Sequence, residues 1–276
     1  MIRRRIGDRW LLFTQDDHAR MAADLAAHVG AGGFEGTDQP AVLRAIALHD
    51  CGWTSHDNQP TLNPAGEPLD VFEGPRNITL PAWAASAEHA AAEDAYSGLL
   101  VSLHALALSA YAASVAEKRP YDEQLHSARA RFAMNQFQHA QIELQETLRK
   151  RLGLRVDRPL KLGLAEGSTD RREQQLSADF RLLQAMDQLS LDLLCTEPPA
   201  PVLKLHPQPG APLTNIVFRR IDDHTATLSP WIFRSDQVHA RIPCRILPAE
   251  TFADVEAFRA AYAAAQATEM TFRLRR

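Results

Sequence analysis

Polar and ionisable residues interrupt the apolar faces of several segments that have helical periodicity. Residues three and four positions apart share one stripe of an α-helix, so the stripe richest in Leu, Ile and Met should face the core. Asp187, for example, shares its stripe with Leu183 and Leu191. The interrupting residues are His18, His49, Asp50, His104 and Asp187. A fold built from these helices has to bury these side chains and give each of them a partner.

A divalent metal ion would meet that requirement for the whole set. A carboxylate that is buried without a partner is strongly destabilising even after the protein relaxes around it. A metal ion keeps carboxylates ionised, binds neutral imidazole nitrogens and lowers the pKa of a bound water. For each residue taken alone the alternative is a hydrogen-bonded core side chain, the more common role of a single histidine on an apolar face. The pattern therefore indicates either a metal site or a buried polar network.

The order of these residues, a histidine, a His-Asp pair and a helical aspartate far downstream, resembles the HD superfamily of metal-dependent phosphohydrolases. A closer resemblance, over nearly the whole chain, is to an uncharacterised bacterial family of unknown function that looks like a divergent HD branch. The segments that carry it are Thr14–Ala19, His49–Trp53, Leu100–His104 and Met186–Leu191. The resemblance implies a helical HD core with four metal ligands, His18, His49, Asp50 and Asp187. HD relatives with two metals use further histidines, for which His89 and His104 are the candidates.

The expected activity is that of a metal-dependent phosphohydrolase acting on a small phosphate ester or nucleotide-like substrate through a metal-activated water. Asp50, as a metal ligand, and His104, as a ligand of a second ion or a proton donor to the leaving group, are the expected catalytic residues. The metal would be Mn, Fe, Ni or Zn, as one ion or two. An HD-type di-iron oxygenase and a non-catalytic, metal-stabilised ligand-binding module are the alternatives. The residues expected to bind substrate are Trp53, His56, Asp57 and Arg129.

Periodicity and turn signals predict a mainly α fold in one domain, residues 1–276, with an HD-type helical bundle over about residues 14–196. An N-terminal hairpin within residues 1–13 and strands within residues 200–276 should form a small sheet, an α+β appendage to the bundle. The segment 52–81, rich in Pro, Gly, Asn and Asp, is predicted to be a long substrate loop. The predicted helices span about 14–28, 38–50, 82–93, 96–115, 123–152, 170–195 and 252–265, and the later strands about 215–220, 226–228, 238–246 and 271–274.

Charge and composition narrow the range of partners. The chain has 30 basic and 34 acidic residues and no long basic stripe along a helix, so we do not expect polymeric nucleic acid as a partner. The most apolar run, residues 99–116, is interrupted by His104 and Ser109, so we expect no membrane helix. Three widely spaced cysteines, Cys51, Cys195 and Cys244, are typical of free thiols in a reducing compartment. We predict a cytoplasmic protein with a small-molecule substrate, and a homodimer remains open.

Overall fold

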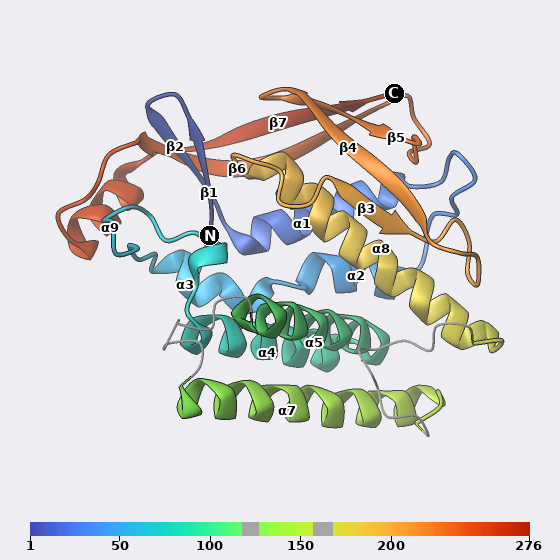
Figure 1. Cartoon of the computed structure of the whole chain (residues 1–276). Helices are drawn as coiled ribbons and strands as arrows, with labels where there is room; N and C mark the ends of the chain where they lie inside the picture. Colours follow the sequence, from blue (N-terminus) through green and yellow to red (C-terminus); the bar gives the residue numbers. More distant parts are fainter. Residues whose placement is uncertain (118–126, 157–167) are drawn as a thin grey trace.

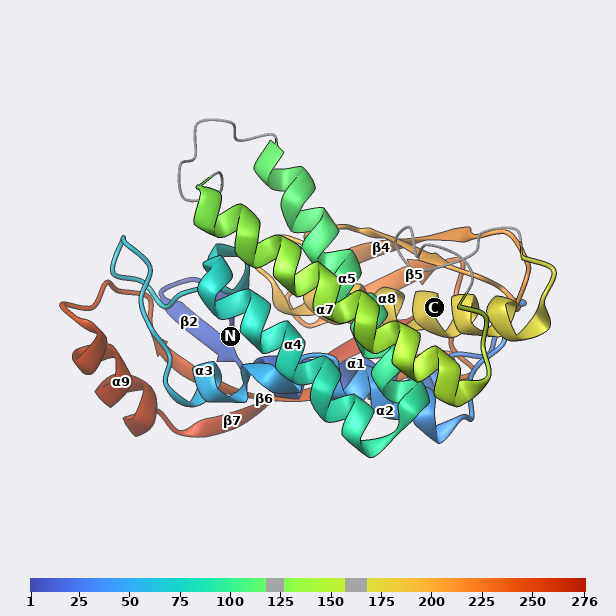
Figure 2. The same cartoon turned by 90° about the horizontal axis from the view of Figure 1, so that it is seen from below.

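The chain forms a curled β-sheet that is covered on its inner face by successive layers of helices (Figure 1). The computed structural model describes residues 1–117, 127–156 and 168–276. Helices α1 and α8 lie against the sheet, α2 follows, and α4, α5 and then α7 lie further out. Seen from below, α7 runs across the outermost layer (Figure 2). The helices that carry the polar residues singled out above therefore lie between the sheet and this outer layer.

Ordinary start and stop signals set the helix ends. Thr14 begins α1 because its hydroxyl accepts a hydrogen bond from the Asp17 amide, and Asp170 caps α8 in the same way. Gly153 ends α7 in the left-handed conformation, at a φ of 63°. The helices are α1 Gln15–His28, α2 Pro40–Leu48, α3 Thr54–Asn58, α4 Arg76–Glu93, α5 Ala95–Glu117, α7 Ala128–Leu152, α8 Arg171–Leu194 and α9 Val255–Ala264, with short 3-10 helices at Cys51–Trp53 and Val71–Glu73.

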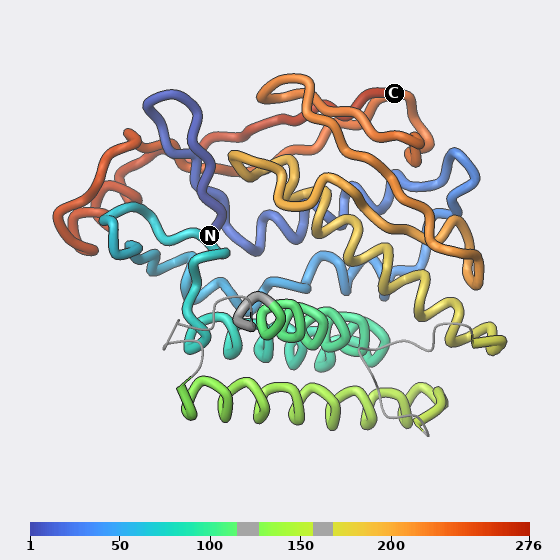
Figure 3. Tube along the Cα trace, viewed as in Figure 1, coloured from blue at the N-terminus to red at the C-terminus, as the bar shows by residue number. Residues whose placement is uncertain are grey.

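The sheet has seven strands in the order β1-β2-β6-β7-β5-β4-β3. The N-terminal hairpin joins the C-terminal strands, because β2 pairs with β6 through partners such as Leu11 and Ile246 (Figure 3). The β5–β7 pair is parallel, and the other neighbouring pairs are antiparallel. The strands are β1 Ile2–Ile6, β2 Arg9–Phe13, β3 Val202–Leu205, β4 Thr214–Asp222, β5 Thr225–Ser229, β6 Gln237–Pro248 and β7 Ala267–Arg275.

The expectation of a mainly α fold is wrong. The protein is mixed α/β, 52% helical and 21% strand, and its sheet is a curled half-barrel, not a small appendage. Alternation of buried and exposed residues runs through almost the whole of the 12-residue strand β6, so one face of a long strand packs on the helices. The edge strand β3 was not predicted. The sharing of one sheet by the hairpin and the C-terminal strands is as expected.

The predicted loop over residues 52–81 is also partly wrong. It contains the two 3-10 helices, α3 and the first turns of α4, which begins at Arg76 and keeps Pro81 inside the helix. The predicted start of the long helix at Glu123 and most of the connection after Gly153 lie outside the described residues. The many turn-forming residues of this segment led us to predict a loop where the structure has short helices.

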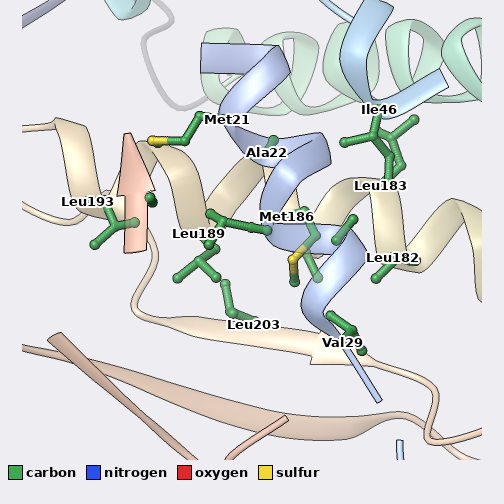
Figure 4. Packing of buried hydrophobic residues seen from close by; sticks show 14 of the residues in the cluster. Met21, Ala22, Val29, Ile46, Leu182, Leu183, Met186, Leu189, Leu193 and Leu203 are labelled. Atoms are coloured by element: carbon green, nitrogen blue, oxygen red, sulfur yellow. The ribbon is translucent and has the colours of Figure 1, made fainter. Parts of the chain in front are cut away.

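The main core lies where α8 packs against α1, α2 and β3 (Figure 4). Met186 and Leu189 of α8, Ile46 of α2 and Leu203 of β3 are all fully buried there. Packing at this density makes the core positions of α8 sensitive to small shifts, so the helix is a rigid support for the polar residues it carries.

Two arginines tie the carboxyl end of α8 to the sheet. Arg4 of β1 is buried and donates to the Leu193 carbonyl at 2.9 Å. Arg220 of β4 donates to the Cys195 carbonyl at 2.8 Å and the Thr196 carbonyl at 2.6 Å. Positive groups at this end of a helix donate hydrogen bonds to its last carbonyls and interact favourably with the negative end of its dipole. The position of α8 along its own axis is therefore set by the sheet.

Among the described residues, one helix, α5, is long and apolar enough to cross a membrane by length and composition alone. Its most apolar stretch, Ala95–Ser114, is 61% buried inside the protein, as in the core helix of a soluble protein. All three cysteines are free thiols, as predicted.

Candidate metal centre

Four helical elements bring the five polar residues to one point in the core. His18 comes from α1, His104 from α5 and Asp187 from α8, while His49 and Asp50 form the end of α2 and the turn after it. All five are buried, with between 0% and 8% of each residue exposed. Sequence periodicity singled out these residues, and the tertiary structure brings them together.

The donor atoms of this cluster lie at the spacing that ligands of one ion have. Oδ1 of Asp187 is 3.3 Å from Nε2 of His18 and 3.3 Å from Nε2 of His49, and these two nitrogens are 3.1 Å apart. Oδ2 of Asp50 is 3.4 Å and 3.7 Å from the same nitrogens. Ligand atoms about 2.0–2.2 Å from one ion are about 2.8–3.6 Å apart at right or tetrahedral angles. His18, His49 and Asp187 fit this spacing closely, and Asp50 lies at its edge.

The hydrogen bonds on the far side of two imidazoles determine which nitrogen faces the cluster. Nδ1 of His49 is 2.7 Å from the Ile46 carbonyl oxygen, which can only accept, so this nitrogen donates. Nδ1 of His18 is 2.6 Å from the Ser190 hydroxyl, whose own proton goes to the Asp187 carbonyl at 2.7 Å. His18 therefore also donates through Nδ1. Both Nε2 atoms are left to bind either a proton or a metal ion, as in metal-ligating histidines held by a second shell.

Several polar atoms at the cluster have no hydrogen-bond partner among the described residues. They are both ring nitrogens of His104 and Oδ1 of Asp50. Nε2 of His104 nevertheless lies 3.4 Å from Oδ2 of Asp187. Buried polar atoms left in this way are rare because they lose their hydration without compensation. A cation bound at the cluster would satisfy Nε2 of His104, which faces Asp187, but not Nδ1 on the far side of the same ring.

The electrostatics of the cluster follow from burial opposed by close charges. Burial favours the neutral form of His18, but Asp187 and Asp50 outweigh it and raise the pKa of His18 to about 9. Burial likewise opposes ionisation of Asp187, but hydrogen bonds from His18 and His49 hold its pKa well below the usual range. For His104, burial dominates and lowers the pKa to about 4. The cluster thus keeps Asp187 ionised and His104 neutral, the forms in which both bind metals.

The donor set suits a borderline transition metal. Imidazole nitrogens favour Zn, Fe, Ni or Cu, and carboxylates add affinity for Mn and Fe, whereas Mg and Ca prefer all-oxygen sites. The side chains of Asp50 and Asp187 are 10% and 12% exposed, whereas those of His18 and His49 are fully buried. Solvent therefore approaches the cluster from its carboxylate side.

Four other residues expected at the site make different contacts. His89 is exposed on α4 and pairs with Glu93 at 3.2 Å. Asp57 is a buried carboxylate that accepts a 2.7 Å hydrogen bond from the Gln15 amide at the start of α1. This hydrogen bond gives the carboxylate a structural role. Trp53 is buried with its ring against His56, at a centroid distance of 6.0 Å. These four residues are not part of the donor set.

Arg129 also lies away from the cluster. It is exposed in the first turn of α7. Helix α7 meets α5 in a register that places Gln145 against Ser102 and Gln138 against Ser109. Arg129 therefore lies nine residues, or about 13 Å of helix, beyond Gln138, on the side away from His104.

Sequence reasoning missed the two groups that orient the imidazoles. Ser190 lies three residues after Asp187 on the same face of α8, and this spacing was the available signal. The other group, the carbonyl of Ile46, is backbone and has no signal in side-chain patterns. Both act through the histidines and not on a ligand directly.

Fold and site together define a mixed α/β protein with a buried histidine and aspartate cluster of metal-ligand type. The chain belongs to a family described as a protein of unknown function, DUF3891, whose model matches residues 1–249. This match covers the hairpin, all the helices of the cluster and most of the sheet. Comparison with curated proteins and with solved structures gave no match.

Proposed function

We propose that this protein holds a divalent transition metal ion at His18, His49, Asp50 and Asp187, and that the centre hydrolyses a small phosphate ester. The observation that carries the proposal is the convergence of two Nε2 atoms, each with its Nδ1 committed to a hydrogen bond, on an ionised Asp187. In the absence of a cation, such a buried arrangement can be satisfied only by a proton.

The phosphohydrolase activity rests on the resemblance to HD enzymes together with the chemistry of the donor set. A divalent ion in such a site lowers the pKa of a bound water and offsets the negative charge that develops on phosphoryl oxygens. Oδ1 of Asp50 has no hydrogen-bond partner among the described residues, so it is available to accept a proton from a nucleophilic water. The partial exposure of Asp50 and Asp187 provides the side of approach for water and substrate.

His104 fits a ligand role better than the role of proton donor. With a pKa of about 4 it is neutral at physiological pH, so it has no readily released proton for a leaving group. It lies at Oδ2 of Asp187, whereas His18 and His49 lie at Oδ1. This division of one carboxylate between two sets of imidazoles favours, as a second candidate, a two-ion centre, including the di-iron oxygenase type.

Metal content tests the proposal directly. Protein purified without chelators or affinity-tag metals should contain about one ion per chain, or two if His104 binds a second, and D187N should lose it. D179N is the matched control, because Asp179 is also a buried carboxylate of α8 but bonds to Tyr96 and Gln175.

Hydrolysis is then measured on a panel of chromogenic phosphomonoesters, phosphodiesters and nucleotides. Turnover that needs the metal, persists in D179N and disappears in D187N supports the phosphohydrolase. Two irons with oxygen consumption and no phosphate release would move the assignment to the oxygenase, and full metal without turnover to a non-catalytic module. Equal and negligible metal in wild type and D187N would overturn the metal centre itself.

A further inference from the structure

The face of the sheet that points away from the helices is covered at one end only. There α9 packs on it, with Phe258 against Trp10, Leu12 and Leu247. The other end, made by β3, β4, β5, β7 and the first half of β6, has no described element over it (Figure 1). This uncovered part of the outer face is called the bare face below.

Arginines gather on the bare face. Along β6 and β7 the core-facing residues alternate with exposed ones, and Arg241, Arg273 and Arg275 are among the exposed set. Arg219 is the corresponding exposed residue of β4. Alternate residues of a strand point to the same side of the sheet, so all four guanidinium groups extend from one surface.

Strand register places these arginines close together. Arg241 pairs with Thr271, which makes Arg273 its diagonal neighbour, and Arg275 lies two residues, or roughly 7 Å, further along β7. Arg219 pairs with Thr227 on β5, and the β5–β7 register, continued by one residue, brings Thr227 beside Arg275. Four like charges thus lie within a few strand spacings of one another.

None of the four guanidinium groups makes a hydrogen bond, an ion pair or an aromatic contact with the described residues. The arginines elsewhere on the sheet differ, since Arg4 and Arg220 are bonded to backbone carbonyls and Arg245 lies over the Tyr262 ring. Glu269 is on the same side of β7 but lies beyond Thr271, away from Arg273. Unpaired like charges at this spacing repel one another. An anionic partner would be attracted to all four charges and would relieve this repulsion.

The side chains around the arginines are mostly hydrogen-bonding ones, and they include His239, which pairs with Arg273. Thr227, Thr271, Asn215 and Gln237 share this surface with them. Arginine with hydroxyl and amide side chains is the set that binds the phosphates of nucleic acids, and guanidinium groups do so bidentately. No Phe, Tyr or Trp occupies these outward-facing strand positions, and the imidazole of His239 is held by Gln237 at 2.6 Å, so the surface has no large platform on which unpaired bases could stack.

We propose that the bare face binds double-stranded nucleic acid through its sugar–phosphate backbone, without reading its sequence. The exposed apolar residues of this side, Val202, Val217 and Ile221, are β-branched residues on β3 and β4, whereas membrane-surface binding relies on Trp, Phe and Leu. The sequence argued against nucleic acid because no basic stripe follows a helix; here the basic residues form a stripe only after strands distant in sequence are aligned. The inference is independent of the metal centre.

Fluorescence anisotropy of a labelled 24-base-pair DNA duplex of mixed sequence, titrated with the full chain, tests the proposal. If each of the four arginines neutralises one phosphate, log K should fall with log salt with a slope of about −3.6, or about a hundredfold in affinity between about 50 and 200 mM salt. A variant carrying R219A, R241A, R273A and R275A should lose most of the affinity and most of that slope. A second duplex of different sequence should bind equally well.

The control variant removes the same charge from exposed arginines elsewhere, R9A, R129A, R151A and R171A. It should bind duplex as wild type does. No binding at low salt, or equal losses in the two variants, would refute the proposal. Binding to vesicles rich in anionic lipid that depends on the four arginines, with no binding to duplex, would refute it in favour of a membrane surface. Melting temperatures of both variants establish that each one is folded.

Discussion

Replacing Ser190 with alanine should weaken the metal centre without changing any of its ligands. The Ser190 hydroxyl accepts from Nδ1 of His18 at 2.6 Å and donates to the Asp187 carbonyl at 2.7 Å. The Ser190 hydroxyl therefore holds the imidazole of His18 and lies in the same turn of α8 as Asp187. In S190A, the Nδ1–H of His18 has no acceptor in a fully buried position.

Two effects follow from this loss, one on stability and one on metal affinity. Leaving one buried donor unsatisfied should lower the free energy of unfolding by about 1–3 kcal/mol. Loss of the second-shell partner should reduce metal affinity by about 10- to 100-fold, because Nε2 of His18 is no longer held toward the ion as an oriented lone pair. The variant should still bind one ion at saturating metal.

Ser109 of α5 provides a closely matched control. Its hydroxyl is also fully buried, donates to a carbonyl three residues earlier, that of Leu106, at 2.7 Å, and accepts from the side chain of Gln138 at 3.1 Å. S109A should be destabilised to a similar extent but should keep wild-type affinity. Competition with a chromophoric chelator measures the affinity, and urea unfolding of the metal-free proteins measures the stability. Equal metal affinity in S190A and S109A would refute the role given to Ser190.

Two further predictions concern pH. Apparent metal affinity should rise steeply with pH and level off near pH 9, because the raised pKa of His18, about 9, means that a proton competes for its Nε2 below that value; chelator competition from pH 6 to pH 10 checks this, and a flat profile would contradict it. Burial raises the pKa of Asp192 to about 7, so the folded state binds this proton more tightly than the unfolded state does. The contribution of Asp192 to the free energy of unfolding is therefore fully present below about pH 4. It is lost as the pH rises through 7, by up to about 4 kcal/mol. D192N keeps an oxygen acceptor for the Ala200 amide, so urea unfolding should show the variant gaining on wild type between pH 5 and pH 8, and a constant difference would count against the effect.

The sequence by itself determined which polar residues face the core. Helical period is a local property, and it identified His18, His49, Asp50, His104 and Asp187 before any tertiary contact was known. The hairpin and several strands were equally local, since alternation and turn residues are read within a few positions. His89 shows the limit of such reasoning, because an alanine-rich helix has no marked apolar stripe to say which side is buried, and the structure places it in solvent.

Only the tertiary structure decided how these parts combine. Alternation is the same in a strand of a two-stranded ribbon and in one of a seven-stranded sheet, so the size, order and curl of the sheet depend on pairings such as β2 with β6, more than 200 residues apart. The same holds for the Ser190–His18 hydrogen bond and for the alignment of Arg219 with Arg241, Arg273 and Arg275. Register and packing join residues that no local pattern relates, because they are settled by which surfaces can be buried together.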